Sequence, residues 1–380
     1  MTTILTKSVT AIITRTGRAG ASYFLPPPCG SRYSEQRLGG ARRAERVPLS
    51  QRNKIRVGDR TTAKSAMRHR PFHPLHSVFV ITAMLSFNPN SRALAQTAGP
   101  RDLSLMVVNA LAPLTPGGVA LIDVSATRDL AQVTGEVRGH AVRFWPAASR
   151  KEWSGLAAVS VESAAGPIAL TIRGRSADGA TATTSVQLVV EPYRFETRRI
   201  QVDPKLVNPP AEELPRIKEE AKAMADAFAI MTPERLWHGP FAAPVPGTAT
   251  SSFGRLTITN GKPAGRHQGA DFRAATGTPV RAPNAGRVVL ARNLYFAGNT
   301  VILDHGLGVF SLLAHLSRID VVPGATVARG DAVGESGATG RVTGPHLHWA
   351  MRFADMSIDP LALMSALSKL SDADVPPSSH

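Results

Sequence analysis

Two histidines separated by a single residue, His346 and His348, lie near the C-terminus in a segment that continues as an apolar run. In an extended strand, side chains two residues apart leave the same face of the sheet, so both imidazoles would enter one space. Two imidazoles in one space can bind a metal ion together, or one can bind it while its neighbour transfers a proton. This segment is therefore the first candidate for chemistry.

Two earlier segments supply groups that could complete such a site. His267 and Asp271 are separated by three residues, and His315 lies between them and the histidine pair. Zinc in hydrolytic sites typically has three ligands from His, Asp or Glu and keeps a fourth position for water. Each residue alone could be a loop histidine or a turn carboxylate. Their combination predicts a metal held by His267, Asp271 and one histidine of the pair, with the other two histidines beside it.

Short motifs around these residues follow one another in a defined order. They are His267-x-x-x-Asp271, Gly277-Thr278-Pro279-Val280, Asp304-His305-Gly306, Ala314-His315-Leu316-Ser317, Gly340-Arg341-Val342-Thr343-Gly344 and Pro345-His346-Leu347-His348. In this order, residues 253–360 resemble the catalytic domain of the lysostaphin-type (LytM-like) zinc metallo-endopeptidases, which are peptidoglycan hydrolases. The resemblance does not extend to the rest of the chain.

The resemblance implies that His267, Asp271 and His348 bind one zinc ion per chain, and that His315 and His346 are catalytic residues that do not bind it. Peptide hydrolysis needs a base for the attacking water and donors for the developing oxyanion. Because no Glu lies in an H-E-x-x-H arrangement, histidine would fill these roles, and which histidine is the base stays open. We interpret Asp304-His305-Gly306 as a strand end with a side-chain-stabilised turn, and Asp359 as a turn residue.

The chain departs from the family pattern at three places. Leu313 precedes the Ala-His-Leu motif where an aromatic residue is common, and Ala350 takes a position that is usually acidic. Some members carry a tyrosine shortly before the first ligand, where this chain has Asn260-Gly261-Lys262. None of these departures removes a ligand.

The basic character of the chain is confined to its first part. The formal net charge is +16, but residues 1–95 contain 16 Lys and Arg against 3 Asp and Glu, and the remainder contains 28 against 25. A strongly basic domain would suggest nucleic acid or an anionic surface as a partner. Because the remainder is close to neutral, we expect no nucleic-acid partner.

Residues 67–95 have the pattern of a secretory signal peptide. A basic start at Met67 precedes an apolar run at 78–85, and Ala93-Leu94-Ala95 supplies the small residues of a cleavage site before Gln96. The run is shorter than the roughly 20 residues that span a bilayer, so no stable membrane span is expected after cleavage. An uncleaved anchor is the alternative. The predicted location is the periplasm or the exterior.

Residues 1–66 are rich in arginine and contain the single cysteine, Cys29. We interpret them as an extension upstream of a true start at Met67, with a disordered basic tail as the alternative. A mature chain beginning at Gln96 would contain no cysteine, so no disulfide would support it in an oxidising compartment.

Residues 96–195 predict an N-terminal immunoglobulin-like β-sandwich, because short alternating segments and Gly or Pro turns follow one another without a helical period. The expected strands are 103–108, 119–124, 141–145, 156–161, 168–172 and 185–190. We interpret His140 as a surface or strand-end residue. Phe144, Trp145 and Trp153 are expected in the core, with a ligand platform as the alternative. The module would be a spacer or would bind the wall or a partner.

Residues 196–247 predict a linker with one amphipathic helix that lies against a domain. Pro215 fits only the first turn of this helix. Its apolar positions recur at helical spacing and are Leu214, Ile217, Ala221, Met224 and Phe228. A partner-binding coiled coil is the alternative. In residues 248–366, strands joined by glycine turns predict an antiparallel β-sheet peptidase domain, with helical periodicity only near 361–370. Residues 367–380 are expected to be a disordered tail.

The sequence therefore predicts a mainly β protein: an exported zinc-dependent endopeptidase that hydrolyses peptide bonds of peptidoglycan stem peptides or cross-bridges. One alternative is a non-catalytic activator or scaffold of other cell-wall hydrolases, which the intact set of candidate ligands argues against. A second alternative is a secreted endopeptidase that acts on proteins.

Overall fold

The computed structural model describes residues 102–110, 114–201, 209–251 and 253–370, which belong to one compact unit. The basic extension, the predicted signal peptide and residues 371–380 of the predicted tail lie outside the described residues. Within the described ranges, no helix is both long enough and apolar enough to cross a membrane.

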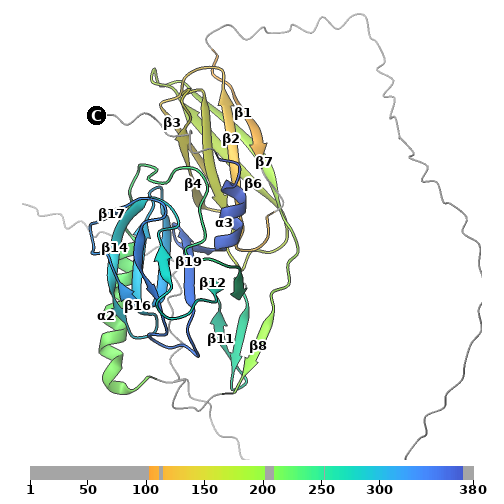
Figure 1. The fold of residues 1–380 in the computed structure, drawn as a ribbon. Coiled ribbons are helices and arrows are strands. Elements are labelled where there is room, and N and C mark those ends of the chain that lie inside the picture. Colours follow the sequence, from red (N-terminus) through yellow and green to blue (C-terminus); the bar gives the residue numbers. More distant parts are fainter. Residues whose placement is uncertain (1–101, 111–113, 202–208, 252, 371–380) are drawn as a thin grey trace, which may run out of the picture. The chain divides into compact units, whose positions relative to one another are not determined.

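The N-terminal part of the fold is a seven-stranded β structure (Figure 1). Its strands are β1 (Leu105–Ala110), β2 (Val119–Ala126), β3 (Gln132–Val137), β4 (His140–Pro146), β5 (Glu152–Ala158), β6 (Gly166–Arg175) and β7 (Thr181–Val190). They pair in the order β1-β2-β5-β4-β3-β6-β7. The two ends of this path, β1 and β7, contact each other, so the strands fold back on themselves as in an immunoglobulin-type sandwich. The predicted sandwich is therefore confirmed.

Strand β3 is the one strand of the sandwich that the sequence pattern did not predict. Its residues are mostly polar, and only Val133 and Val137 are buried. The turn that follows places Arg138 and Gly139 at φ 49° and 79°, which suits a tight hairpin between β3 and β4. Strand β5 begins four residues earlier than the predicted strand 156–161.

Two of the three candidate aromatic residues of the sandwich, Phe144 and Trp153, are in its core, as predicted, whereas Trp145 is buried in a cluster shared with the C-terminal sheet. Phe144, Trp145 and Trp153 are each no more than 7% exposed, which leaves no exposed platform for a ligand. His140 begins β4, and its Nδ1 lies 3.4 Å from a carboxylate oxygen of Asp355. It is a strand-end histidine, as expected.

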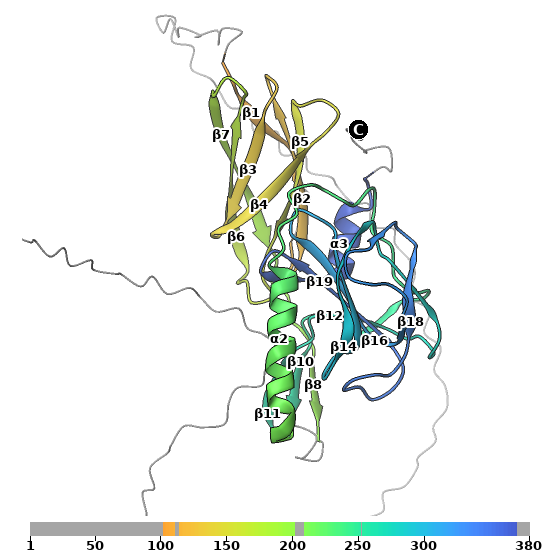
Figure 2. The ribbon, with the colours of Figure 1, turned by 90° about the vertical axis from the view of Figure 1, so that its left-hand side faces the viewer.

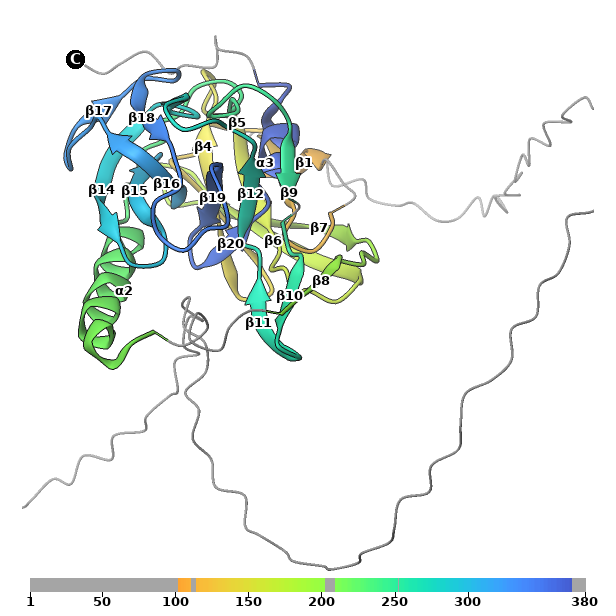
Figure 3. The same ribbon diagram turned by 60° about the horizontal axis from the view of Figure 1, so that its bottom comes forward.

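A 15-residue helix and a small sheet follow the sandwich. Helix α2 (Leu214–Phe228) continues a short 3-10 turn, η1 (Ala211–Glu213), has a proline in its first turn, and packs along β14 (Figure 2). The apolar side of α2 contacts the C-terminal sheet described below, where Phe228 and Phe310 meet edge to face at 5.5 Å. The predicted helix is therefore confirmed and lies against its own chain. Strand β8 (Thr197–Ile200) pairs in parallel with β10 (Leu256–Thr259), which pairs with β11 (Lys262–Arg266) (Figure 3).

The C-terminal part is a ten-stranded sheet in which all the strand pairs are antiparallel. Its main path is β17-β14-β15-β16-β19-β12-β9, with β13, β18 and β20 beside it. The strands are β9 (Ala249–Ser251), β12 (Gly269–Phe272), β13 (Pro279–Arg281), β14 (Gly286–Leu294), β15 (Gly298–Asp304), β16 (Val309–Ile319), β17 (Thr326–Val327), β18 (Ala332–Ser336), β19 (Leu347–Phe353) and β20 (Met356–Ile358). The antiparallel β fold expected for this region is confirmed.

Helix α3 (Pro360–Leu367) ends the described fold. Asp359 is its N-cap, because the carboxylate accepts a hydrogen bond from the amide of Leu361 at 2.9 Å. The interpretation of Asp359 as a plain turn residue was therefore wrong. Its backbone amide also donates to the carbonyl of Gly117 in the sandwich at 2.8 Å. The residue thus begins α3 and joins it to the first part of the fold.

The segment from 236 to 246 has no regular secondary structure but is packed in the interior. Trp237, Phe241 and Val245 are nearly or fully buried in one hydrophobic cluster with residues of the sandwich and of the ten-stranded C-terminal sheet. The rings of Trp237 and Trp145 meet edge to face at 5.5 Å. This part of the predicted linker is therefore a structural element of the core.

Candidate metal centre

Three of the predicted site residues converge on one point. Asp271 Oδ1 lies 2.9 Å from Nε2 of His267 and 2.8 Å from Nδ1 of His348. The two ring nitrogens are 3.1 Å apart. Among the described residues, these three form the one group of His, Cys, Asp or Glu side chains that could hold a metal ion.

Two of the three residues are brought together by strand register. Asp271 in β12 lies directly opposite His348 in β19, and such cross-strand neighbours present their side chains on the same face. Along β19 the buried residues alternate with the others, so that Trp349 enters the core while His348 faces the centre. His267 precedes β12 in the short connection from β11, and its amide donates to the carbonyl of Arg255.

A glycine keeps β12 and β19 close enough for this arrangement. Gly269 lies opposite Ala350, and a Cβ atom added to Gly269 would overlap the carbonyl oxygen of Trp349 and crowd the ring of His348. A side chain at this position would push the two strands apart. The distance between His348 and the residues of β12 therefore depends on the absence of a side chain there.

The pKa shifts of Asp271 and His348 suit a metal ion. Burial raises the pKa of Asp271, but the hydrogen bonds from the rings of His267 and His348 outweigh it and hold the pKa well below its usual range. Burial lowers the pKa of His348. Metal ligands must be an ionised carboxylate and neutral imidazoles, and two nitrogens with one oxygen form a donor set that zinc takes in hydrolytic sites. The residues present therefore fit zinc.

The other two predicted residues lie beside this group. His346 Nε2 is 3.9 Å from Asp271 Oδ1, and the His315 ring centre is 4.9 Å from that of His346 and 6.0 Å from that of His348. The fold thus brings all five predicted residues into one centre. Three of them converge and two flank them.

His315 lies at a β-bulge. Leu313 pairs with Val301 and Leu316 with Asn299, so Ala314 and His315 together face a single residue of β15. The backbone of His315 has φ 65°, a left-handed conformation that is unfavourable for a residue with a Cβ atom. A bulge re-aims a side chain out of the normal strand alternation, and here it turns His315 towards the centre.

Both flanking histidines have the same hydrogen bond to a carbonyl oxygen. His315 Nδ1 donates to the carbonyl of Thr339 at 3.0 Å, and His346 Nδ1 donates to the carbonyl of Gly344 at 2.9 Å. A neutral ring that donates through Nδ1 has an unprotonated Nε2. Burial lowers the pKa of His315 to about 4, helped by the charge of His348. Each ring can therefore offer Nε2 as a proton acceptor.

His305 is a structural residue, as the sequence predicted. It is fully buried, its Nδ1 donates to the carbonyl of Ala285 at 2.7 Å, and its Nε2 lies 2.8 Å from the hydroxyl of Ser311. The preceding Asp304 accepts from the amide of Gly306 at 2.8 Å, which stabilises the expected turn.

The sequence did not predict the residues that support His315. The carbonyl of Ala297 accepts from the His315 amide, and Thr339 binds the His315 ring through its own carbonyl. The Thr339 hydroxyl also donates to the carbonyl of Leu316. These contacts come from the backbone of turns, where the residue type carries little signal. The one indication in the sequence that Thr339 supports the site was its position directly before the motif that begins at Gly340.

Comparison with known proteins identifies the family of the part of the chain that contains this centre. Residues 265–360 match the sequence model of peptidase family M23. The peptidoglycan DD-endopeptidase ShyA of Vibrio cholerae is 48% identical over 85 residues, which are 22% of this chain and 20% of that protein. The DD-carboxypeptidase/endopeptidase Mpg of Neisseria meningitidis is 38% identical over 108 residues, 28% of this chain and 25% of that protein. The matched part is thus a fifth to a quarter of the length of these relatives.

A solved structure is similar over a larger part of the chain. A protein from Pseudomonas aeruginosa, described as a candidate M23 peptidase, superposes with a TM-score of 0.52 at 30% sequence identity. The similarity covers 67% of this chain and 97% of that structure, so it extends beyond residues 265–360. On the strength of this near-complete coverage and of the family match across both segments of the metal centre, the chain belongs to peptidase family M23.

Proposed function

We propose that this protein is an exported zinc-dependent endopeptidase that hydrolyses peptide bonds of bacterial peptidoglycan, in stem peptides or cross-bridges. The observation that carries the proposal is the convergence of His267, Asp271 and His348, with two further histidines beside them. Family membership supports a peptidase, and the names of the relatives matched over this domain support peptidoglycan as its substrate.

His267, Asp271 and His348 would hold one zinc ion per chain. Bound there, zinc would act as a Lewis acid that polarises the peptide carbonyl and acidifies water. The chain supplies an anionic carboxylate and two imidazoles around a common point. His348 is fixed by the pairing of β19 with β12, and Asp271 by the same register.

His315 and His346 would share the proton transfers. A base must take a proton from the attacking water, and a donor must stabilise the oxyanion that develops on the peptide carbonyl. Both rings are oriented by a carbonyl oxygen at Nδ1, so both can direct Nε2 into the centre. We assign the base to one of them and the oxyanion donor, in its protonated form, to the other.

Export through residues 67–95 and the domain limits 96–195, 196–247 and 248–366 are part of the same proposal. Cleavage before Gln96 would deliver the protein to the periplasm or the medium, where peptidoglycan lies. N-terminal sequencing of protein recovered from these fractions should begin near Gln96. Recovery of a cytoplasmic chain that still begins with Met1 would contradict export.

The activity is tested with residues 96–380 and purified peptidoglycan, with and without a chelator, by identifying the products by mass. We expect cleavage of peptide bonds that the chelator abolishes and that added zinc restores. The double variant His315→Ala/His346→Ala is the matched control, because it leaves the three candidate ligands in place. Products from this control equal to those of the wild type would contradict the proposed roles.

The same assay separates the two alternative functions. A non-catalytic activator would give no products alone and would increase the yield of another wall hydrolase. A protease that acts on proteins would cleave an unfolded protein substrate and leave peptidoglycan intact.

A further inference from the structure

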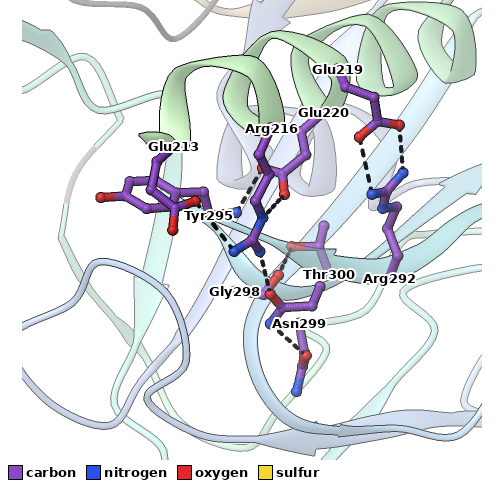
Figure 4. A network of polar contacts seen from close by, with 10 residues as sticks. Glu213, Arg216, Glu219, Glu220, Arg292, Tyr295, Gly298, Asn299 and Thr300 are labelled. Carbon is purple, nitrogen blue, oxygen red and sulfur yellow. Dashed lines mark hydrogen bonds and ion pairs between the residues drawn. The ribbon is translucent and has the colours of Figure 1, made fainter. Parts of the chain in front are cut away.

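Helix α2 places a buried carboxylate on the turn that joins β14 to β15. Glu220 is 4% exposed, although it lies on a helix with many charged residues. Its Oε2 accepts a hydrogen bond from the backbone amide of Tyr295 at 2.7 Å, and its Oε1 accepts one from Nε of Arg216 at 2.7 Å (Figure 4). Both oxygens are therefore used, one within the helix and one on the turn.

A second connection joins the same helix to the strands on either side of the turn. Arg216 donates through a terminal nitrogen to the side-chain oxygen of Asn293 at 2.8 Å. The amide group of Asn293 donates to Asn299 at 2.9 Å. Arg216 also lies over the ring of Tyr295, at 5.8 Å from its centre. The helix thus holds the turn at its start and across its base.

The other side of this turn holds His315. The carbonyl of Ala297 accepts from the His315 amide at 2.9 Å. The amide of Asn299 donates to the hydroxyl of Thr339 at 2.9 Å, and Thr339 accepts from the His315 ring through its carbonyl. One short turn is therefore bound to α2 on one side and to both the backbone and the ring of His315 on the other.

His315 needs this support because of its conformation. Its amide leaves the regular pairing of β15 and β16 at the bulge and finds its acceptor in Ala297 instead. A left-handed backbone at a residue with a Cβ atom persists only where its surroundings hold it. If the turn moved, the His315 ring would lose its fixed direction, while the ligands on β12 and β19 would be unaffected.

We infer that α2 is a positioning element of the metal centre, and that Glu220 is a positioning residue that acts on His315 through the turn Tyr295–Ala297. This inference rests on the proposed function for the catalytic role of His315. Within the described ranges, Glu220 has no polar contact with the candidate ligands or with His315, and it reaches the turn through the Tyr295 amide and through Arg216.

A neighbouring carboxylate provides a matched control. Glu219 forms a two-point ion pair with Arg292, at 2.9 Å and 3.1 Å, from the same turn of the helix (Figure 4). Both side chains of this pair are about half exposed, at 57% for Glu219 and 43% for Arg292. The pair joins α2 to β14 but has no contact with the turn. Removal of this pair therefore weakens the attachment of α2 to the sheet but leaves the connection from α2 to the turn and to His315 in place.

The test compares Glu220→Ala, Glu220→Gln and Glu219→Ala in the full chain. Glu220→Ala should lower kcat by roughly 10- to 100-fold, the usual range for a residue that orients an active group, with KM and zinc content unchanged. Glu220→Gln keeps an oxygen for the Tyr295 amide and should restore kcat to within a few fold. Glu219→Ala should behave as the wild type. Equal kcat in Glu220→Ala and Glu219→Ala would overturn the inference, and so would loss of zinc in Glu220→Ala.

Amide hydrogen exchange of β16 gives a readout that does not depend on activity. We expect the His315 amide to exchange faster in Glu220→Ala than in the wild type, with zinc and without it, and to be unchanged in Glu219→Ala. If the wild type proves inactive on peptidoglycan, the proposed function fails, and hydrogen exchange still decides whether Glu220 supports His315. Unchanged exchange in Glu220→Ala would overturn the inference.

A milder variant keeps the test decisive if Glu220→Ala does not fold. Asn293→Ala removes an exposed side chain and breaks the second connection alone. We expect it to change the His315 exchange rate and kcat in the same direction but by less. Wild-type values for both would contradict the proposed role of α2.

Discussion

Asp271 and His348 face each other across two regularly paired strands, whereas His315 lies at a bulge in β16 with a left-handed backbone. The first region needs only strand register and a glycine to bring its side chains together. The second region depends on a turn, on the Thr339 carbonyl and, through Glu220, on a helix far away in sequence.

This difference separates two properties of the centre. Two of the residues that could bind the metal, Asp271 and His348, are fixed by the backbone of the sheet itself, which is hard to distort without unfolding it. His315 is held by single hydrogen bonds to the carbonyls of Ala297 and Thr339, which substitutions that move the supporting turns can weaken without unfolding the sheet. Metal binding and catalytic rate should therefore respond to different substitutions, and the following predictions test that separation.

The largest effect is expected from the sheet region. His267→Ala, Asp271→Ala or His348→Ala removes one of three convergent donors and should leave the purified protein nearly free of zinc. Activity should fall by more than the roughly 10⁴-fold upper range of an acid-base residue. Zinc content by mass spectrometry and peptidoglycan cleavage are measured on the same samples. Full zinc occupancy in all three variants would show that the ligands are misassigned.

The flanking histidines should lose rate without losing zinc. His315→Ala and His346→Ala should each lower kcat by roughly 10²–10⁴-fold, the range for a positioned acid-base or oxyanion group. Zinc stoichiometry should stay near that of the wild type. His140→Ala, at a partly exposed strand end, is the control and should keep full activity. A zinc-free variant would identify that histidine as a ligand, and full activity in both would contradict the mechanism.

Two glycine substitutions should have smaller effects, one on zinc binding and the other on kcat. Gly269→Ala would force β12 from β19 and should weaken zinc binding, by roughly the 10- to 100-fold typical of residues that orient ligands. Gly298 has φ 65°, and its Cβ would overlap Thr339, so Gly298→Ala should lower kcat less than His315→Ala does. Zinc affinity and kcat are measured for both. Identical signatures would contradict two separately supported regions.

The smallest effect at neutral pH is expected from His305, which supports the sheet from the core. Burial lowers its pKa from 6.5 to about 4 in the folded protein. The unfolded chain therefore binds a proton more readily than the native one as the pH falls from 6.5. The stability that the neutral, buried ring of His305 contributes is complete above pH 6.5 and is lost progressively as the pH falls towards 4.

This pH dependence is measured on metal-free protein by denaturant unfolding between pH 4 and pH 7, a range that brackets the two pKa values. His305→Gln lacks the titrating ring and serves as the comparison, since every other ionisable group remains. We expect its stability at neutral pH to be lower and its decline on acidification to be less steep. An unchanged slope would contradict the assignment to His305.

The sheet region was largely predictable from the sequence, because its signal is local. The spacing of His346 and His348 places both on one side of a strand, and the His267 to Asp271 spacing marks the other segment. The sequence pattern alone did not indicate that β12 pairs with β19, because register joins residues distant in the chain. The resemblance to a known family supplied that connection.

The region around His315 was not predictable in the same way. Glu220 belongs to a run of charged residues that is typical of a solvated helix face, yet its partner, the Tyr295 amide, lies 75 residues away. A backbone donor has no sequence signature. Strand β3 was missed for a related reason. Most of its residues are polar, and its two buried valines are too few to give a recognisable alternation.

The burial of Trp237, Phe241 and Val245 affects how stable the two halves of the chain would be if they were separated. A single hydrophobic cluster contains side chains of the sandwich, of this segment and of the peptidase sheet. A chain cut between residues 195 and 248 would expose Val119, Leu121 and Trp145 on one fragment and their former neighbours on the other. The sandwich keeps a second core of its own around Ile122 and Leu170, but each fragment would expose apolar surface that is buried in the whole chain, so we expect each half to be less stable alone than in the whole protein.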